Sequence, residues 1–372
     1  MSEEKKYYLD FATLENFMRD CFVAAGVPAD DAALCADVLI TADKLGIDSH
    51  GIGRLKPIYI DRINDGIQNP VTEVEYVRKG PATAVIDAHD GMGMVASREA
   101  MSYAIEAARK FGIGMTVIRN STHYGIAGYY TLMAEKAGMI GISGTNARPS
   151  IAPTFGVENM LGTNPLTFTI PSDDPFPFFL DCATSVTQRG KIEVYGRAGK
   201  ELPLGWVIDE EGHSRTDTVQ VLEDLVKGKA ALTPLGGLGE DTAGYKGYGY
   251  ATVVEILSAA LQQGTFLKGL LGFSADGKKQ PYHLGHFFIA INVEAFTDLA
   301  DFKHTVGELL RELRNSKKAP GHDRIFTAGE KEYETYLERQ KTGVPINLAL
   351  QKNIIDLKKM YHLDQYNFDF MK

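Results

Sequence analysis

Two short segments carry the residue types that anion binding and acid–base chemistry need. The first is residues 48–54, which place Ser49, His50 and Arg54 at a predicted loop-to-helix junction. If the helix extends over both, His50 and Arg54 share one face. The planar guanidinium of Arg54 suits a carboxylate, which it can hold through two parallel hydrogen bonds. The alternative is a surface helix start, with Ser49 as its cap and Arg54 in a solvated ion pair.

The second segment is residues 120–125, which follow a predicted strand and precede a predicted helix. In α/β proteins, ligands bind where strands end and helices begin. The positive end of that helix would lower the proton affinity of His123 and favour the neutral ring, which can take a proton. We therefore expect His123 to act as a general acid/base. The alternative is a histidine that is hydrogen-bonded to a turn.

Residues 141–185 are rich in glycines and short polar side chains of the kind that hold a cofactor. Backbone N–H groups and small amide or hydroxyl side chains there can bind an amide ring or a diphosphate. An acidic residue that ends an apolar strand can bind a cofactor hydroxyl. The candidates are Asn146, Gly162, Thr163, Asn164 and Asp181. Each also fits an ordinary turn, because glycine and asparagine are common turn formers.

Lys246 and His286 are two further candidates. Lys246, flanked by glycines at a predicted helix start, can approach a phosphate or a carboxylate, or it is a solvated surface lysine. His283 and His286 have a spacing that suits metal binding, but no Asp, Glu or Cys in that segment completes a ligand set. We therefore expect no metal site. His286 is then a cofactor contact or a histidine whose hydrogen bonds are satisfied at the end of a strand.

The composition excludes several classes of protein. The 372 residues are 44% hydrophobic and 23% charged, with a net charge of -9, as in ordinary globular proteins. No apolar run is long enough to span a membrane, and the excess of acids argues against binding to nucleic acid. Three cysteines, Cys21, Cys35 and Cys182, favour reduced thiols. With no secretory or transit segment at the start, we expect a cytoplasmic protein.

The elements that position these residues follow from the hydrophobic periodicity. Apolar residues at helical spacing predict helices between residues 8 and 69, and short β-rich runs then alternate with helical runs. Residues 171–177 are typical of a hairpin connection, so the predicted sheet is mixed. The glycine-rich stretch 233–249 predicts a loop before a helix over residues 251–264.

The chain is charged and helical again near its end, with helices predicted over residues 298–316, 330–342 and 349–361. We expect an α/β fold with a mixed sheet covered by helices, and a helical domain built from both chain ends. The predicted parts are residues 1–75, 76–315 and 316–372. No G-x-G-x-x-G dinucleotide motif follows a strand and no phosphate-binding loop is present, so residue chemistry alone does not name the reaction.

Six segments in this order resemble the type-2 malate/L-lactate dehydrogenase family: DSHGIGRL, STHYGIAGYY, GTNPLTF, DCATS, YKGYGY and GHFFIAIN. The resemblance covers about residues 9–347. It implies a nicotinamide-dependent oxidoreductase and homodimer, with NAD or NADP, in an L-sulfolactate dehydrogenase-like fold that is not a Rossmann fold. It also implies that His123 is the catalytic acid/base, that Ser49, His50 and Arg54 bind substrate, and that Arg54 anchors a carboxylate. Asn146, Gly162, Thr163, Asn164, Asp181, Lys246 and His286 fall in segments that resemble the cofactor-binding stretches of the family.

The family resemblance favours malate and oxaloacetate as the substrate pair. The alternatives are lactate, sulfolactate, ureidoglycolate or piperideine-2-carboxylate chemistry, or a non-catalytic nucleotide-binding relative. Lys246 or His50 could hold a second carboxylate. Two departures from the relatives, His322 and an insertion over residues 268–285, bear on the size of the substrate.

Overall fold

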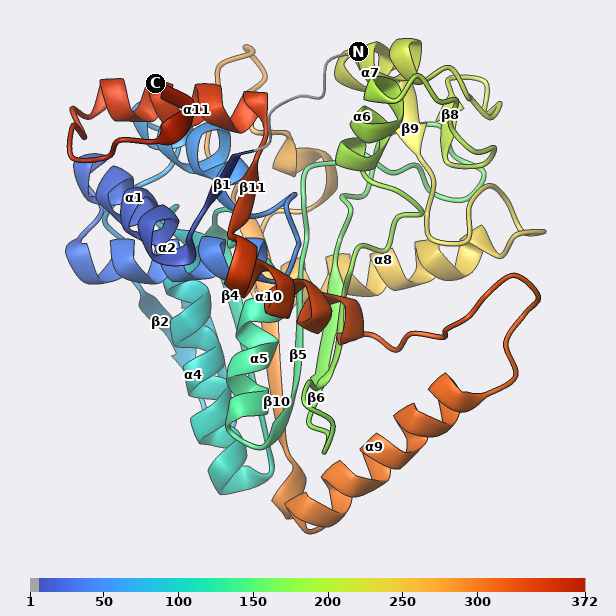
Figure 1. Cartoon of the computed structure of the whole chain (residues 1–372). Helices are drawn as coiled ribbons and strands as arrows, with labels where there is room; N and C mark the ends of the chain where they lie inside the picture. The colour runs from blue at the N-terminus through green and yellow to red at the C-terminus, as the bar shows by residue number, and fades with distance from the viewer. Residues whose placement is uncertain (1–6, 372) are drawn as a thin grey trace.

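A mixed sheet of seven strands forms the centre of the protein in a computed structural model that describes residues 7–371 (Figure 1). The strand order is β2-β3-β4-β10-β5-β6-β7. Their bounds are β2 Glu75–Lys79, β3 Thr83–Asp87, β4 Ile113–Ser121, β10 Leu284–Asn292, β5 Met139–Thr145, β6 Leu166–Ile170 and β7 Phe178–Cys182. Neighbours β3 and β4 are parallel, and the other neighbouring pairs are antiparallel. The predicted α/β class and mixed sheet are confirmed.

The central strand β10 is apolar on both faces because helices cover both sides of the sheet. Phe288 packs in a core with α4 (Gly93–Phe111) and α5 (Gly128–Lys136), which lie side by side in Figure 1. Phe287 packs on the other side with Val254 of α8 (Gly244–Ala259). Full burial of one such ring stabilises the fold by about 1.5–3 kcal/mol. The run LGHFFIAIN therefore fixes the middle of the sheet.

Helix α8 begins at Gly244, seven residues before the predicted start, so the loop predicted over 233–249 is partly helix. The glycines there permit close packing. A Cβ atom on Gly244 would lie 2.0 Å from the carbonyl oxygen of Gly237, and one on Gly247 would lie 2.1 Å from that of Leu235. The low helix propensity of glycine suggested a loop, but packing against the preceding chain decides the structure.

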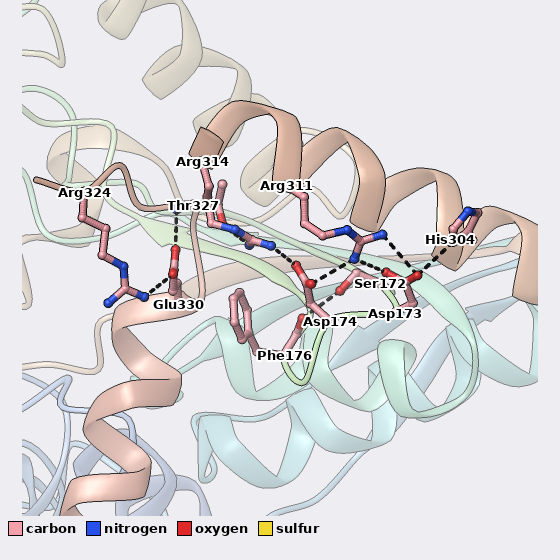
Figure 2. Close-up of polar contacts among 10 residues, drawn as sticks. All are labelled: Ser172, Asp173, Asp174, Phe176, His304, Arg311, Arg314, Arg324, Thr327 and Glu330. Atoms are coloured by element: carbon pink, nitrogen blue, oxygen red, sulfur yellow. Dashed lines mark hydrogen bonds and ion pairs between the residues drawn. The ribbon is translucent and has the colours of Figure 1, made fainter. Parts of the chain in front are cut away.

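The hairpin predicted at residues 171–177 is confirmed by the antiparallel pairing of β6 with β7. Ion pairs join this connection to α9 (Leu299–Asn315), as Figure 2 shows. Arg314 contacts Asp174 at 2.6 Å, and Arg311 contacts Asp173 at 2.8 Å. Gly307 and Leu310 are the buried residues of α9, and these ion pairs add polar contacts between the helix and the hairpin connection.

Both chain ends pack into one helical part, as expected. Helices α1 (Phe11–Ala24) and α2 (Ala29–Lys44) share a core with α11 (Leu348–Met360). Strand β1 (Tyr7–Leu9) pairs antiparallel with β11 (Val344–Ile346). Helices α9, α10 (Glu330–Thr342) and α11 lie within one residue of their predicted bounds. Figure 1 shows α1, α2 and α11 gathered at one end of the sheet.

A small α/β unit over residues 189–232 was not predicted. It contains two helices and a two-stranded antiparallel sheet, namely α6 Arg189–Arg197, β8 Val207–Asp209, α7 Thr218–Lys227 and β9 Ala230–Leu232. Its core includes Ile192, Val207 and Val221. Short 3-10 helices occur at Leu267–Leu271, Val293–Ala295 and Asp369–Met371. Within the described residues, no helix combines the length and apolar character that crossing a membrane requires.

Candidate active site

The candidate site lies at the edge of the sheet where three strands end. Strands β4 and β5 both run antiparallel to β10, and β7 runs in the same direction as β5, so their carboxyl ends lie at one edge. A pocket of about 360 Å³ opens there. This volume falls in the usual range for small-ligand sites, roughly 300–1,000 Å³. Of the predicted site residues, Ser49, His50, Arg54, His123, Asn146, Thr163 and Asp181 line it.

One helical segment carries the arginine side of the pocket. A 3-10 turn at Ile52–Arg54 continues into a π-helix at Leu55–Ile60 and then into α3 at Asp61–Asn64. Such π-helical turns are rare and are frequent at functional sites. Arg54 and Arg62 both line the pocket from this segment. The segment begins after His50, so the predicted helical pairing of His50 with Arg54 is wrong, although both face the same pocket.

A buried carboxyl group holds the loop before this segment through a hydrogen bond. Asp43 accepts a hydrogen bond from the backbone N–H of Ile52 at 2.8 Å. Burial raises the pKa of Asp43 to about 8. A Cβ atom on Gly51 would lie 1.8 Å from a carboxyl oxygen of Asp43, so only glycine fits at residue 51. Arg339 of α10 also holds this loop, through the Asp43 carbonyl at 2.6 Å and the Asp48 carboxylate at 2.6 Å.

His123 has one ring nitrogen engaged by the protein. Its Nδ1 contacts Tyr59 Oη at 2.6 Å and the backbone N–H of Gly125 at 3.2 Å, which leaves Nε2 available. Burial lowers the pKa of His123 well below its ordinary value, and the nearby His50 and Arg54 lower it further. The prediction that a helix end lowers it does not hold, because α5 begins only at Gly128.

His50 is a second neutral imidazole beside His123. Their rings stack with centroids 5.6 Å apart. Ser49 Oγ contacts His50 Nδ1 at 2.8 Å, and burial lowers the pKa of His50 to about 4. Arg54 Nε donates to the backbone carbonyl of Ser49. The terminal nitrogens of Arg54 remain for a ligand, so a neutral base and a fixed cation lie in one pocket.

The two predicted asparagines use their side chains to hold loops together. Asn146 lines the pocket, but its amide donates to Thr265 O at 3.1 Å and accepts from Gly285 N at 2.8 Å. Asn164 is fully buried; its amide accepts from Ala147 N at 3.1 Å and donates to Glu255 at 2.8 Å. Both amides therefore hold loops of the site together, and their predicted contact with a cofactor stays a prediction.

His286 and Lys246 do not line the pocket. His286 is fully buried, with Nδ1 2.7 Å from Thr145 Oγ1 and Nε2 2.8 Å from Ser121 Oγ. Its ring stacks on Tyr124 at 4.4 Å, and burial lowers the pKa of His286 to about 3. This favours the interpretation of a histidine with satisfied hydrogen bonds. Lys246 is exposed on the first turn of α8, where its predicted role is not tested.

Asp181, Thr163 and Gly162 shape the wall opposite the arginines. Asp181 accepts from Gly128 N at 2.8 Å and from Thr167 Oγ1 at 2.9 Å, and burial raises the pKa of Asp181. A Cβ atom on Gly162 would lie 2.4 Å from the carbonyl oxygen of Ala147. Glycine therefore lets the loops around residues 147 and 162 touch, which brings Thr163 into the pocket.

Four pocket-side residues were missed. Arg62, Arg148 and Tyr282 line the pocket, and Tyr59 lies against His123. Helical spacing from Arg54 could have revealed Arg62, because residues at four-residue intervals share a face. No local signal connects Tyr282 to Arg62, which is 220 positions earlier in the chain.

A family model for the malate/L-lactate dehydrogenases matches residues 9–355 of the chain. The chain belongs to this family. The match confirms the resemblance found in the six segments and extends slightly beyond the expected range. Members of this malate/L-lactate dehydrogenase family are oxidoreductases, which agrees with a pocket that joins a neutral histidine to an arginine.

The proteins that this chain resembles include two malate dehydrogenases. The chain is 46% identical to the malate dehydrogenase of Pyrococcus abyssi over 333 residues, which are 90% of this chain and 89% of that protein. The crystal structure of malate dehydrogenase from Entamoeba histolytica superposes with a TM-score of 0.92 at 45% identity, covering 96% of this chain and 99% of that chain. The L-sulfolactate dehydrogenase of Methanocaldococcus jannaschii is 39% identical, covering 89% of this chain and 91% of that protein. The expected fold is therefore confirmed.

Proposed function

We propose that the protein is a malate dehydrogenase that transfers a hydride between malate and NAD, with NADP as the alternative cofactor. The observation that carries the proposal is the meeting of His123 and Arg54 in one pocket. These residues come from different elements, and together they provide a proton acceptor and a carboxylate-binding group. The malate dehydrogenases among the relatives support the choice of substrate.

The chain's own residues account for substrate orientation and proton transfer. Arg54 would hold the C1 carboxylate of malate through charge-assisted hydrogen bonds. In the tautomer with its proton on Nδ1, His123 donates to Tyr59 Oη and gives up the longer hydrogen bond from Gly125 N–H, and Nε2 can then take the proton of the C2 hydroxyl. Such proton transfer contributes about 10²–10⁴-fold to the rate. In the reverse direction Nε2 returns the proton to the oxygen at C2.

Part of the pocket lining suits a nicotinamide ring. Short side chains line the pocket at Ala147, Thr163 and Pro165, beside Asp181. Short side chains leave room for a flat ring, and Thr163 offers a hydroxyl to a carboxamide. In this proposal Thr163 and Asp181 hold the nicotinamide end, which when bound supplies the carbon that exchanges hydride with C2.

A cytoplasmic homodimer is part of the proposal. The three cysteines are free thiols, which fits a reducing compartment. The homodimer is supported by the family resemblance, and the division at residues 75 and 315 is proposed with it.

The test is an absorbance assay at 340 nm that crosses NADH and NADPH with five 2-oxo acids or imines. We expect oxaloacetate to give the highest kcat/KM, above pyruvate, sulfopyruvate, the ureidoglycolate couple and piperideine-2-carboxylate. A higher kcat/KM with sulfopyruvate or the cyclic imine would replace malate with that substrate. Tight NADH binding with no turnover would instead indicate a non-catalytic relative.

A further inference from the structure

Arg62 is a cationic pocket residue with no acidic partner. Its guanidinium lies over the ring of Tyr282, 4.2 Å from the ring centroid. In the part of the chain that the structure describes, no carboxylate forms an ion pair with Arg62. Arg119, another partly buried arginine, does have such a partner, since it contacts Asp87 at 2.8 Å. A partly buried charge without a counter-ion is unfavourable. An anionic ligand would relieve this cost.

Positive charge is concentrated around Arg62. The pocket is lined by Arg54, Arg62, Arg148 and Arg189, of which Arg189 pairs with Glu193 at 3.0 Å. Burial lowers the pKa of Arg62, and the guanidiniums of Arg54 and Arg148 lower it further. Asp181 lies on the same pocket, but its two oxygens already accept hydrogen bonds from Gly128 and Thr167. The pocket therefore presents more guanidinium groups than one carboxylate can use.

Two arginines of one helical segment line the pocket, which suits a ligand with two carboxylates. Arg54 and Arg62 lie eight residues apart on one helical segment, with Ile58 of the pocket wall between them. Both cations act on the same imidazole, that of His123. We propose that Arg62 binds the distal carboxylate of a four-carbon 2-hydroxy or 2-oxo dicarboxylate, while Arg54 binds the C1 carboxylate and His123 faces C2. This inference rests on the proposed function and names the group that selects the substrate.

The insertion over residues 268–285 positions Arg62. Its Tyr282 covers the guanidinium, and its Lys279 forms an ion pair with Asp65 at 2.7 Å, just beyond α3. A planar ring over the guanidinium restricts its orientation and leaves the edge with the N–H groups free. Tyr282 is therefore a positioning residue for Arg62.

The first test compares oxaloacetate with pyruvate, which has a methyl group in place of the distal carboxylate arm. We expect Arg62→Gln to lower the ratio of their kcat/KM values by about 100-fold, the loss of a charge-assisted bidentate contact. Arg54→Gln should lower kcat/KM for both acids and leave the ratio close to the wild-type value. An unchanged ratio in Arg62→Gln, or an increase only in KM for NADH, would overturn the inference.

The second test addresses the ring. Tyr282→Leu should lower the same ratio by about 5–10-fold because Arg62 loses its stacking partner, whereas Tyr282→Phe keeps the ring and should preserve most of the ratio. Lys278→Ala serves as the matched control. It changes an 82% exposed side chain of the same insertion and should leave the ratio close to the wild-type value. Equal losses in the Leu and Phe variants would contradict the positioning role.

A binding measurement separates this inference from the proposed function. Malate should raise the Tm of the wild-type protein more than lactate does, and the difference should vanish in Arg62→Gln. If malate discrimination is seen without turnover on any acid, the proposed dehydrogenase activity fails and Arg62 recognition stands. If turnover is normal but Arg62→Gln discriminates like the wild type, the inference fails and the proposed function stands.

Discussion

At the scale of single residues, the neighbours of His123, the proposed acid–base group, keep its ring neutral without a carboxylate partner. A histidine paired with an acid would have a raised pKa, but His123 lies against Tyr59 and beside His50 and Arg54. Burial lowers the pKa of His123, and the neighbouring His50, Arg54 and Arg62 lower it further, so the ring is neutral and able to accept a proton at neutral pH. This arrangement suits oxidation of a hydroxyl group.

Replacing His123 with asparagine should remove the proton acceptor and keep a polar side chain of similar size. We expect kcat for malate oxidation to fall by about 100-fold or more, with little change in Tm. The measurement is steady-state kinetics at saturating cofactor. Wild-type turnover in this variant would remove His123 from its proposed role.

The acid limb of the pH profile should respond to Arg62. Oxidation needs neutral His123, so activity falls as the pH drops through the pKa of that ring. Because Arg62 is one of the cations that lower this pKa, Arg62→Gln should raise the pKa of His123 and move the acid limb of kcat/KM to higher pH. Profiles of both proteins with malate check the direction. A limb that moves to lower pH would show that Arg62 does not act on His123.

Tyr59 should act by holding the ring of His123. Tyr59→Phe keeps the buried ring but removes the hydroxyl that contacts Nδ1 at 2.6 Å. We expect kcat to fall by about tenfold while KM changes little, because substrate contacts are retained. Tyr361→Phe removes a hydroxyl elsewhere in the helical part and serves as the control. A change confined to KM would argue against a role in proton transfer.

At the scale of elements, α10 contacts the loop before Ile52 that lines the pocket with Ser49 and His50. Arg339 donates to the Asp43 carbonyl and to both carboxylate oxygens of Asp48, at 2.6 and 3.0 Å for the latter. Arg339→Ala should loosen residues 48–54 and raise KM for malate about 5–10-fold, with kcat within about twofold. The exposed neighbour Gln340 provides the control variant, Gln340→Ala. A fall in kcat of about 5–10-fold would instead indicate that Arg339 affects the position of His123.

The attachment of α9 should depend on Asp174. Its side chain is 9% exposed and contacts Arg314 at 2.6 Å (Figure 2). Asp174→Ala leaves a partly buried guanidinium unpaired, so the free energy of unfolding should fall by about 3 kcal/mol. Glu223→Ala breaks the exposed pair with Lys227 and should cost less than about 0.5 kcal/mol. Urea titrations followed by circular dichroism compare the two; equal midpoints would show that the α9 pair contributes little.

Local patterns in the sequence were sufficient for some elements and insufficient for others. Helix α10 was predicted at its observed bounds because its charged, periodic sequence is typical of a helix that is largely exposed to solvent, as α10 is. Strands β8 and β9 have only three residues each, too short for a periodic signal. His123 and Arg54 were found from local chemistry. Tyr282 and Arg339 were not, because their partners lie more than 200 residues away and only tertiary packing brings them together.

At the scale of the whole molecule, the two terminal regions of the chain share a core with the segment that carries Arg54. One core contains residues of α1, α2 and the C-terminal region together with Ile52, Leu55 and Tyr59 from the segment that carries Arg54. Loosening the end of the chain should therefore disturb the arginine side of the pocket. The first and third of the predicted parts both contribute to this core, in line with the expected packing of the two chain ends, and the division at residues 75 and 315 stays a proposal.

Phe368 offers a test of this dependence. It is 3% exposed, and its ring packs edge-on against Phe17 with centroids 5.5 Å apart. Phe368→Ala should lower the free energy of unfolding by about 3–5 kcal/mol, and malate oxidation should be lost at a lower urea concentration than in the wild type. Leu348→Ala, at a side chain that is 62% exposed on α11, should change stability by less than about 0.5 kcal/mol. Phe368 follows His123 by 245 positions in the chain. If activity and stability are lost at the same urea concentration, the chain ends and the pocket unfold as one unit. If activity persists to the wild-type urea concentration, they do not.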